Sequence, residues 1–190
     1  MIITLTGDEK RIRSLRQDDL DILREWDSDP ELQQLTGRKF DADEEMTGWW
    51  TAVERDRSRL AVAIVDNEGR LIGDIELENV SWRAREAELR IAIGDKTYWN
   101  RGFGTEALTE MANVASEQLG LKSLYLRVSE KNVRAIHSYR KVGFRKVGRL
   151  SATGRLQGRQ NLVLMRLNLV SSSQGVSDRA TNEGLVSTAR

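Results

Sequence analysis

Residues 98–107 read YWNRGFGTEA, and the rest of the chain is organised around this segment. Residues 86–93 before it alternate like a strand, whereas the apolar residues after it recur every three or four positions, as in a helix. Gly102 and Gly104 therefore lie where a strand gives way to a helix. Glycine lets backbone N–H groups approach a ligand closely, and the first helical turn offers free N–H groups at the positive end of its dipole. The segment is a candidate seat for a phosphate or pyrophosphate, although a plain tight turn explains the two glycines equally well.

The remaining sequence predicts a mixed α/β (α+β) fold in which helices flank a twisted, mostly antiparallel sheet. Strands are expected at residues 11–16, 60–65, 71–80, 86–93, 124–128, 144–147 and 162–167. Helices are expected from Asp18 or Asp19 to a break at Pro30, from Asp43, after Gly104, and from Asn132 to Val142. We expect one domain over residues 1–169, followed by a polar and flexible tail at residues 170–190.

The composition excludes several kinds of protein. The 190 residues include no cysteine, which rules out disulfides, thiolate metal sites and thiol nucleophiles. His137 is the only histidine, so no metal site built from several histidines is expected, and we predict no bound metal. No run of residues has the apolar length of a signal peptide or a membrane span, so we expect a cytoplasmic protein without a membrane partner.

The charges are unevenly distributed although the net charge is only +1. Residues 18–56 contain thirteen Asp and Glu against four Lys and Arg, whereas residues 127–166 contain eleven Lys and Arg against one acidic residue. Such segregation is typical of a protein that handles a cation at one end and an anion at the other, but two solvated faces of opposite sign give the same pattern.

A second informative segment, residues 128–144, reads VSEKNVRAIHSYRKVGF. Asn132 and Tyr139 are seven residues apart, so on a helix they share one face at a separation of about 10 Å. Asn can bond the amide groups of an extended ligand, and Tyr can donate a proton or a hydrogen bond to a leaving group. A helix cap and a core aromatic are the alternative roles for these two residues. His137 falls on nearly the opposite side of the helix from Tyr139, so we expect it to be exposed and without a catalytic role.

Together the two segments resemble the GNAT acyltransferases, which use acyl-CoA. Residues 99–105, WNRGFGT, resemble the pyrophosphate-binding motif of that family, and residues 132–144 resemble its following N-x-x-A-x-x-x-Y-x-x-x-G-F segment. The similarity covers roughly residues 10–169. One departure is Trp99, which stands where the family often has Gln or Arg. An aromatic-rich version is common in members that resemble ribosomal-protein N-terminal acetyltransferases and polyamine acetyltransferases, so we interpret Trp99 as the mark of that subgroup.

The resemblance implies a single GNAT-like domain that binds acetyl-CoA as its acyl donor. It implies that the strand at residues 89–93 offers its backbone to the pantetheine arm and that Asn132 contacts the pantetheine. It also implies that the backbone N–H groups of residues 101–105 hold the pyrophosphate, where the side chain of Arg101 adds positive charge. The expected donor-binding residues are Ile91, Ala92, Ile93, Arg101, Gly102, Phe103, Gly104, Thr105 and Asn132. The excess of positive charge after residue 127 suits the phosphates of CoA.

The reaction implied is direct attack of a neutral primary amine on the thioester, through a tetrahedral intermediate. A backbone N–H near Ile91 is expected to stabilise the oxyanion, and Tyr139 to assist the departing thiolate. Glu88 and Glu86 share one face of their strand, and either is a candidate base for the amine proton. Asp74 and Glu76 are weaker candidates, and a solvated polar face is the alternative for Glu86 and Glu88.

Other functions stay open at this point. Gly102-x-Gly104-x-x-Ala107 also fits a dinucleotide-binding fingerprint, and a domain that only binds acyl-CoA or nucleic acid would share the basic half. Nucleic acid is the less favoured partner, because no recognised motif accompanies the arginines. If the acidic segment at residues 18–56 flanks the acceptor mouth, the acceptor is a cationic amine: a polyamine, a protein N-terminus or a similar molecule. A homodimer is left open.

Overall fold

The computed structural model describes residues 11–169 apart from 37, 39, 41 and 155–157. The polar tail predicted at residues 170–190 lies outside the described residues. Within the described part of the chain, no helix has the length and apolar character needed to cross a membrane.

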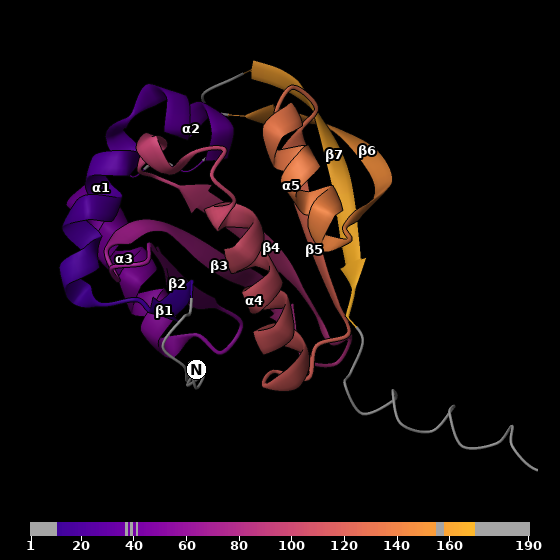
Figure 1. Ribbon diagram of the computed structural model, residues 1–190, viewed down its shortest axis with the longest axis horizontal. Coiled ribbons are helices and arrows are strands. Elements are labelled where there is room, and N and C mark those ends of the chain that lie inside the picture. The colour runs from indigo at the N-terminus through magenta and orange to yellow at the C-terminus, as the bar shows by residue number, and fades with distance from the viewer. Residues whose placement is uncertain (1–10, 37, 39, 41, 155–157, 170–190) are drawn as a thin grey trace, which may run out of the picture.

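The described chain forms a seven-stranded sheet with the strand order β1-β2-β3-β4-β5-β7-β6 (Figure 1). All neighbouring strands are antiparallel except β4 and β5, which run parallel. The sheet is therefore mixed and mostly antiparallel, as the sequence predicts. The strands are β1 (Ile12–Ser14), β2 (Leu60–Val65), β3 (Leu71–Ser81), β4 (Glu86–Ile93), β5 (Ser123–Ser129), β6 (Arg145–Gly154) and β7 (Gly158–Asn168).

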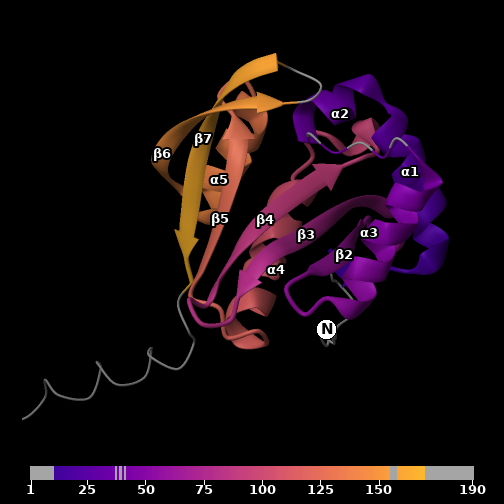
Figure 2. The same ribbon diagram turned by 180° about the vertical axis from the view of Figure 1, so that it is seen from behind.

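Helices cover both faces of the sheet. They are α1 (Leu20–Ser28), α2 (Pro30–Thr36), α3 (Asp43–Arg55), α4 (Phe103–Glu117) and α5 (Val133–Val142), with short 3₁₀ turns at Gln17–Asp19 and Lys96–Tyr98. Figures 1 and 2 show α4 and α5 on one face and α3 on the opposite face. Under α4, Leu108 and Met111 belong to the same buried apolar cluster as Ile75 and Leu89, because alternate residues of β3 and β4 point to that side.

The first helix ends at Ser28, as the predicted break at Pro30 requires, but a further helix that was not predicted, α2, begins at Pro30. Proline suits the first position of a helix, where its missing N–H would have no partner. The Asp29 carboxylate oxygen Oδ1 accepts hydrogen bonds from the N–H groups of Glu31 and Leu32, at 2.9 and 3.1 Å. The segment that reads as a helix stop is thus also the N-cap of the next helix.

The parallel pair β4–β5 is joined only at its beginning. The register pairs Glu86 with Ser123, Ala87 with Leu124 and Glu88 with Tyr125, and the pairing ends there. Beyond that point the two strands diverge, so the sheet opens into a V between the second half of β4 and the second half of β5 (Figure 2). This opening is the feature that positions the site described below.

Directly after β4, Gly94 lies against the indole ring of Trp26 in α1. A Cβ atom added at Gly94 would lie 2.0 Å from Cδ2 of the Trp26 ring. We therefore expect Gly94→Ala to lower the free energy of unfolding by about 1–3 kcal/mol, because the indole has to move out of its contact. Urea unfolding of the purified variant measures the change.

A matched control is the same substitution at Gly48, an exposed position inside α3. A Cβ there meets no atom within 4 Å, so Gly48→Ala should raise stability by about 0.5–1 kcal/mol through helix propensity. Equal effects at Gly48 and Gly94 would show that the Trp26 contact does not limit the space at the end of β4.

Candidate active site

A cavity of about 420 Å³ lies in the V between β4 and β5. Its wall is built by residues of β3, of the second half of β4, of β5, of α2, of the turn before α4 and of α5. Of the predicted site residues, nine line it: Glu88, Ile91, Ala92, Ile93, Gly102, Gly104, Thr105, Asn132 and Tyr139. Residues up to 51 positions apart in the sequence therefore meet at one opening in the sheet.

The backbone of β4 presents alternate residues to the opening. The N–H of Gly94 donates to the carbonyl of Ile72 on β3 at 2.9 Å, so the antiparallel pattern turns the backbone of Ala92 towards β3 as well. The backbone groups of Ile91 and Ile93 then face the opening. The carbonyl of Ile93 accordingly accepts a 2.8 Å hydrogen bond from the indole Nε1–H of Trp99.

The two glycines of the turn differ in what they need. Gly102 caps α4 with φ +94°, a left-handed conformation that residues with a side chain rarely adopt. The backbone conformation alone therefore accounts for a glycine at this position. A Cβ at Gly104 would meet only the side chains of Ile93 and Ile91, at 3.6–4.0 Å, which is ordinary contact. The folded chain thus tolerates a side chain at position 104, and the absence of one leaves room for an approaching ligand.

The first turn of α4 is suited to an anion. The helical hydrogen bonds begin with Thr105, whose N–H donates to the carbonyl of Gly102 at 2.9 Å. The N–H groups of Phe103 and Gly104 precede this ladder at the positive end of the helix dipole. Gly104 and Thr105 line the cavity, so the turn presents this end of α4 to it.

The guanidinium of Arg101, predicted to add charge at this turn, packs on two aromatic rings of the turn. It stacks over the rings of Tyr98 and Phe103, 5.0 and 5.5 Å from their centroids, and neither Arg101 nor Phe103 lines the cavity. The positive charge that does line the cavity here is Arg134 of α5, whose guanidinium lies 3.6 Å from the centroid of the Trp99 ring. Burial lowers the pKa of Arg134. Sequence reasoning missed this residue, because only the fold brings the second segment over Trp99.

Asn132 and Tyr139 both reach the cavity from α5. Asn132 also caps that helix, since its Oδ1 accepts from the N–H of Ala135 at 3.1 Å; a ligand contact would therefore use its NH₂ group. Tyr139 is buried, with its ring 5.8 Å from that of Phe144, and burial raises the pKa of its phenol to about 12. His137 is exposed on the same helix.

The candidate bases are held in ion pairs. Glu86 does not line the cavity, and its carboxylate accepts from Arg166 at 2.6 Å. Glu88 lines it, but Arg127 donates to both of its carboxylate oxygens, at 2.7 and 3.0 Å. These pairs explain why neither glutamate presents a free carboxylate to the opening.

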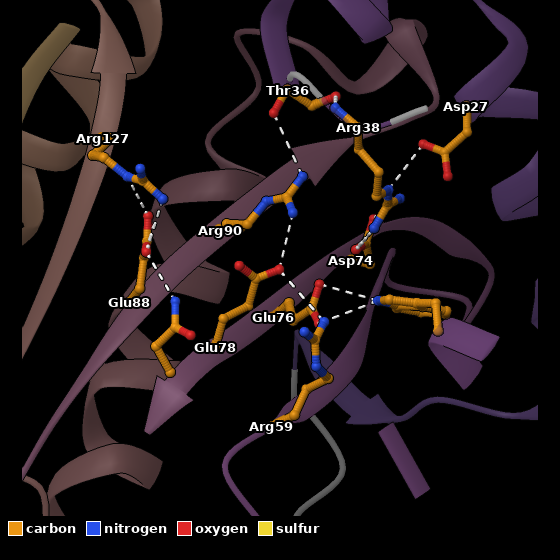
Figure 3. Close-up of polar contacts among 12 residues, drawn as sticks. Asp27, Thr36, Arg38, Arg59, Asp74, Glu76, Glu78, Glu88, Arg90 and Arg127 are labelled. Carbon is orange, nitrogen blue, oxygen red and sulfur yellow. Dashed lines mark hydrogen bonds and ion pairs between the residues drawn. The ribbon is translucent and has the colours of Figure 1, made fainter. Parts of the chain in front are cut away.

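A row of further carboxylates continues along the same face of β3 (Figure 3). Asp74 accepts two hydrogen bonds from Arg38, at 2.7 and 3.0 Å, and lines the cavity. Glu76 is buried and does not line the cavity; its carboxylate contacts Arg59 and the indole of Trp49. Burial is the main cause that raises the pKa of Glu76, and the negative charge of Glu78 is the second. Glu78, which the sequence did not single out, also lines the cavity. Burial alone would raise the pKa of Glu78, but the charge and hydrogen bond of Arg90 hold that pKa below its usual value.

Comparison with known proteins decides the family. The chain matches the family described as "Acetyltransferase (GNAT) domain" over residues 11–145. The chain belongs to the GNAT acetyltransferase family. Membership confirms the resemblance of the two motifs, and it makes the chain an acetyl-CoA-dependent N-acetyltransferase. The family match decides against the dinucleotide-binding alternative, although β4, α4 and β5 do form a parallel βαβ unit.

Several relatives of this GNAT domain are polyamine enzymes. Spermidine N(1)-acetyltransferase of Escherichia coli strain K12 is 28% identical over 141 residues, which cover 74% of this chain and 75% of that protein. The spermidine N(1)-acetyltransferase of Vibrio cholerae is 23% identical, over 78% of this chain and 86% of that protein. A crystal structure of the spermidine N-acetyltransferase from Vibrio cholerae in complex with CoA and spermine has a TM-score of 0.76 at 22% identity, covering 83% of this chain and 94% of that chain. The last likeness establishes the GNAT fold.

Proposed function

We propose that this chain transfers the acetyl group of acetyl-CoA to a primary amine that enters from the β3–β4 face. One observation carries the proposal: a single cavity is lined both by the glycine turn of α4 and by the polar residues of that face. Tyr139 lines the same cavity. The donor and the acceptor would thus meet inside the opening of the sheet.

The residues at the opening would divide the work as follows. The first turn of α4, with Arg134, would hold the phosphates, and Asn132 would bond the pantetheine through its NH₂ group. The N–H of Ile91 would donate to the carbonyl oxygen as it gains negative charge. The phenol of Tyr139 would donate a hydrogen bond to the sulfur as the C–S bond breaks. These roles rest on the positions of the side chains and on the family resemblance.

The attacking amine has to lose a proton to a base. Glu88 and Glu86 stay predictions, and their carboxylates are disfavoured as the base because Arg127 and Arg166 already hold them in ion pairs. A proton could instead leave through water to the wider carboxylate row, in which Glu76 binds a proton more readily than an ordinary glutamate.

The test is an assay of CoA release with acetyl-CoA and a panel of primary amines. Because relatives are spermidine acetyltransferases, spermidine and spermine are the first acceptors to include. Turnover of any primary amine supports the proposal. Binding of acetyl-CoA without turnover of any acceptor would identify a non-catalytic acyl-CoA-binding module instead. A salt-sensitive gel shift would test for nucleic-acid binding, and light scattering of the purified protein for a homodimer.

Replacing Gly104 with alanine should separate binding of the donor from folding. A Cβ there makes only ordinary contacts in the folded chain but enters the space at the first turn of α4. We expect about a 10-fold or greater loss of acetyl-CoA affinity, since losing close hydrogen bonds to a charged group costs about 1.5–3 kcal/mol. Isothermal titration calorimetry measures the affinity, with Gly48→Ala as the control that should bind normally. Native affinity in Gly104→Ala would remove the turn from the donor site.

A further inference from the structure

The acceptor side of the cavity presents arginines, although its wall is built on carboxylates. Three acidic residues line the cavity, and an arginine is bound to each: Arg38 to Asp74, Arg90 to Glu78 and Arg127 to Glu88. Figure 3 shows the three arginines along one side of the row of carboxylates. The helix α2 from the acidic segment lines the cavity, but among the described residues none of the acidic side chains at positions 18–56 does so.

Exposure differs sharply within these pairs. The side chain of Arg127 is 51% exposed and that of its partner Glu88 is 6% exposed. Arg90 is 34% exposed against 14% for Glu78. Arg38 and Asp74 are both buried, at 9% and 4%. A molecule that enters from solvent therefore meets the guanidinium groups of Arg127 and Arg90 first, while the carboxylates stay behind them.

Both of these arginines keep donors for a ligand. Arg127 uses Nε and Nη2 for Glu88, and Arg90 uses Nη1 for Glu78 with only a long 3.5 Å contact from Nη2 to the carbonyl of Thr36. A guanidinium has five N–H donors in a planar fork that matches a carboxylate. An ammonium group, in contrast, meets carboxylates that already have an arginine as counter-charge.

We propose that the acceptor is an amine that also carries a carboxylate, and that Arg127 and Arg90 bind this carboxylate. The inference rests on the proposed function and narrows its substrate class. The transfer itself is unchanged: the neutral amine nitrogen bonds to the acetyl carbon, the C–S bond breaks, and its electron pair leaves with the sulfur. The amine proton passes to solvent or to the carboxylate row, and the acceptor's carboxylate serves only to hold the molecule.

Matched pairs of acceptors test the inference. Lysine is cadaverine with one added carboxylate, and ornithine is putrescine with one added carboxylate. We expect kcat/KM to be about 10- to 100-fold higher for the carboxylated member of each pair, the effect of a hydrogen bond between charged groups. A second arm compares the peptide amides Asp-Ala and Asn-Ala, which distinguishes an acidic peptide N-terminus from a free amino acid. Mass spectrometry identifies the acetylated nitrogen.

The double variant Arg127→Gln with Glu88→Gln removes the guanidinium without leaving a buried carboxylate unpaired. It should reduce the preference for lysine over cadaverine, measured as the ratio of their kcat/KM values, about 10-fold. A loss of folded enzyme or of donor binding lowers both kcat/KM values equally, so it does not change this ratio. A preference for cadaverine, putrescine or spermidine in the native enzyme would overturn this inference and leave the proposed function standing. No turnover of any amine would overturn both.

Discussion

Replacing Tyr139 with phenylalanine is expected to lower kcat about 10- to 100-fold while acetyl-CoA binds as tightly as before. The reason lies in the acidity of the phenol. Its pKa is raised to about 12 by burial, whereas a thiol ionises near ~8.5. Full proton transfer to the thiolate would be uphill by about 5 kcal/mol, so Tyr139 acts as a hydrogen-bond donor to developing charge, an interaction of about 1.5–3 kcal/mol. Steady-state kinetics and calorimetry separate the two effects.

Two further measurements sharpen this prediction. The phenol stays protonated below its pKa, so its ionisation should produce no loss of kcat up to about pH 10. Tyr125→Phe serves as the control, because Tyr125 lies on β5 outside the cavity lining and its loss should leave kcat near the native value. Native turnover in Tyr139→Phe, or equal losses in both variants, would remove Tyr139 from the chemistry.

Replacing Arg38 with leucine is expected to lower the free energy of unfolding by about 3–5 kcal/mol. Arg38 is buried between Asp27 and Asp74, donating to Asp27 at 2.9 Å and to Asp74 at 2.7 and 3.0 Å. Its removal leaves two buried carboxylates without their cation, and an uncompensated charge in the interior strongly destabilises a folded protein. Arg38 joins α1 to β3 through these bonds, so the loss should appear in cooperative urea unfolding.

Asp27→Asn is the matched variant, and it should change stability by no more than about 1 kcal/mol. Asp74 still neutralises Arg38, and one oxygen of Asp27, Oδ2, has no hydrogen-bond partner. Burial raises the pKa of Asp27, so the folded chain holds this proton more tightly than the unfolded chain. The charged Asp27 therefore lowers the free energy of unfolding at neutral pH, and this loss of stability shrinks as the pH falls through the pKa of Asp27 in the folded chain. Equal losses in Arg38→Leu and Asp27→Asn would contradict this account of the cluster.

Much of the fold follows from local patterns in the sequence. The strands and the helices at α3, α4 and α5 show in the spacing of apolar residues, because each element buries one face. The helix α2 was missed, since Asp29 and Pro30 end one helix and begin another, and a short apolar pattern cannot separate these roles. Both family motifs belong to single turns or helices, which is why they can be read without the fold.

The electrostatics of the site could not be read in the same way. Glu88 looks like a free carboxylate until β5 brings Arg127 beside it, thirty-nine positions along the chain. Arg134 lines the cavity only because α5 lies next to Trp99. Segregated charge along the sequence likewise says little about the cavity, whose carboxylates come from β3 and β4 instead of the acidic segment. Pairing between distant side chains is a property of the folded chain.

The early end of the β4–β5 pairing has a consequence for handling the protein. Where the two strands part, each keeps a stretch of inner edge that meets no neighbouring strand. Unpaired edges are templates on which another extended chain can add, and this is a common route to aggregation. A bound donor lying along that edge would shield it. Purification and storage with CoA should therefore preserve a monodisperse sample for longer than storage of the bare protein.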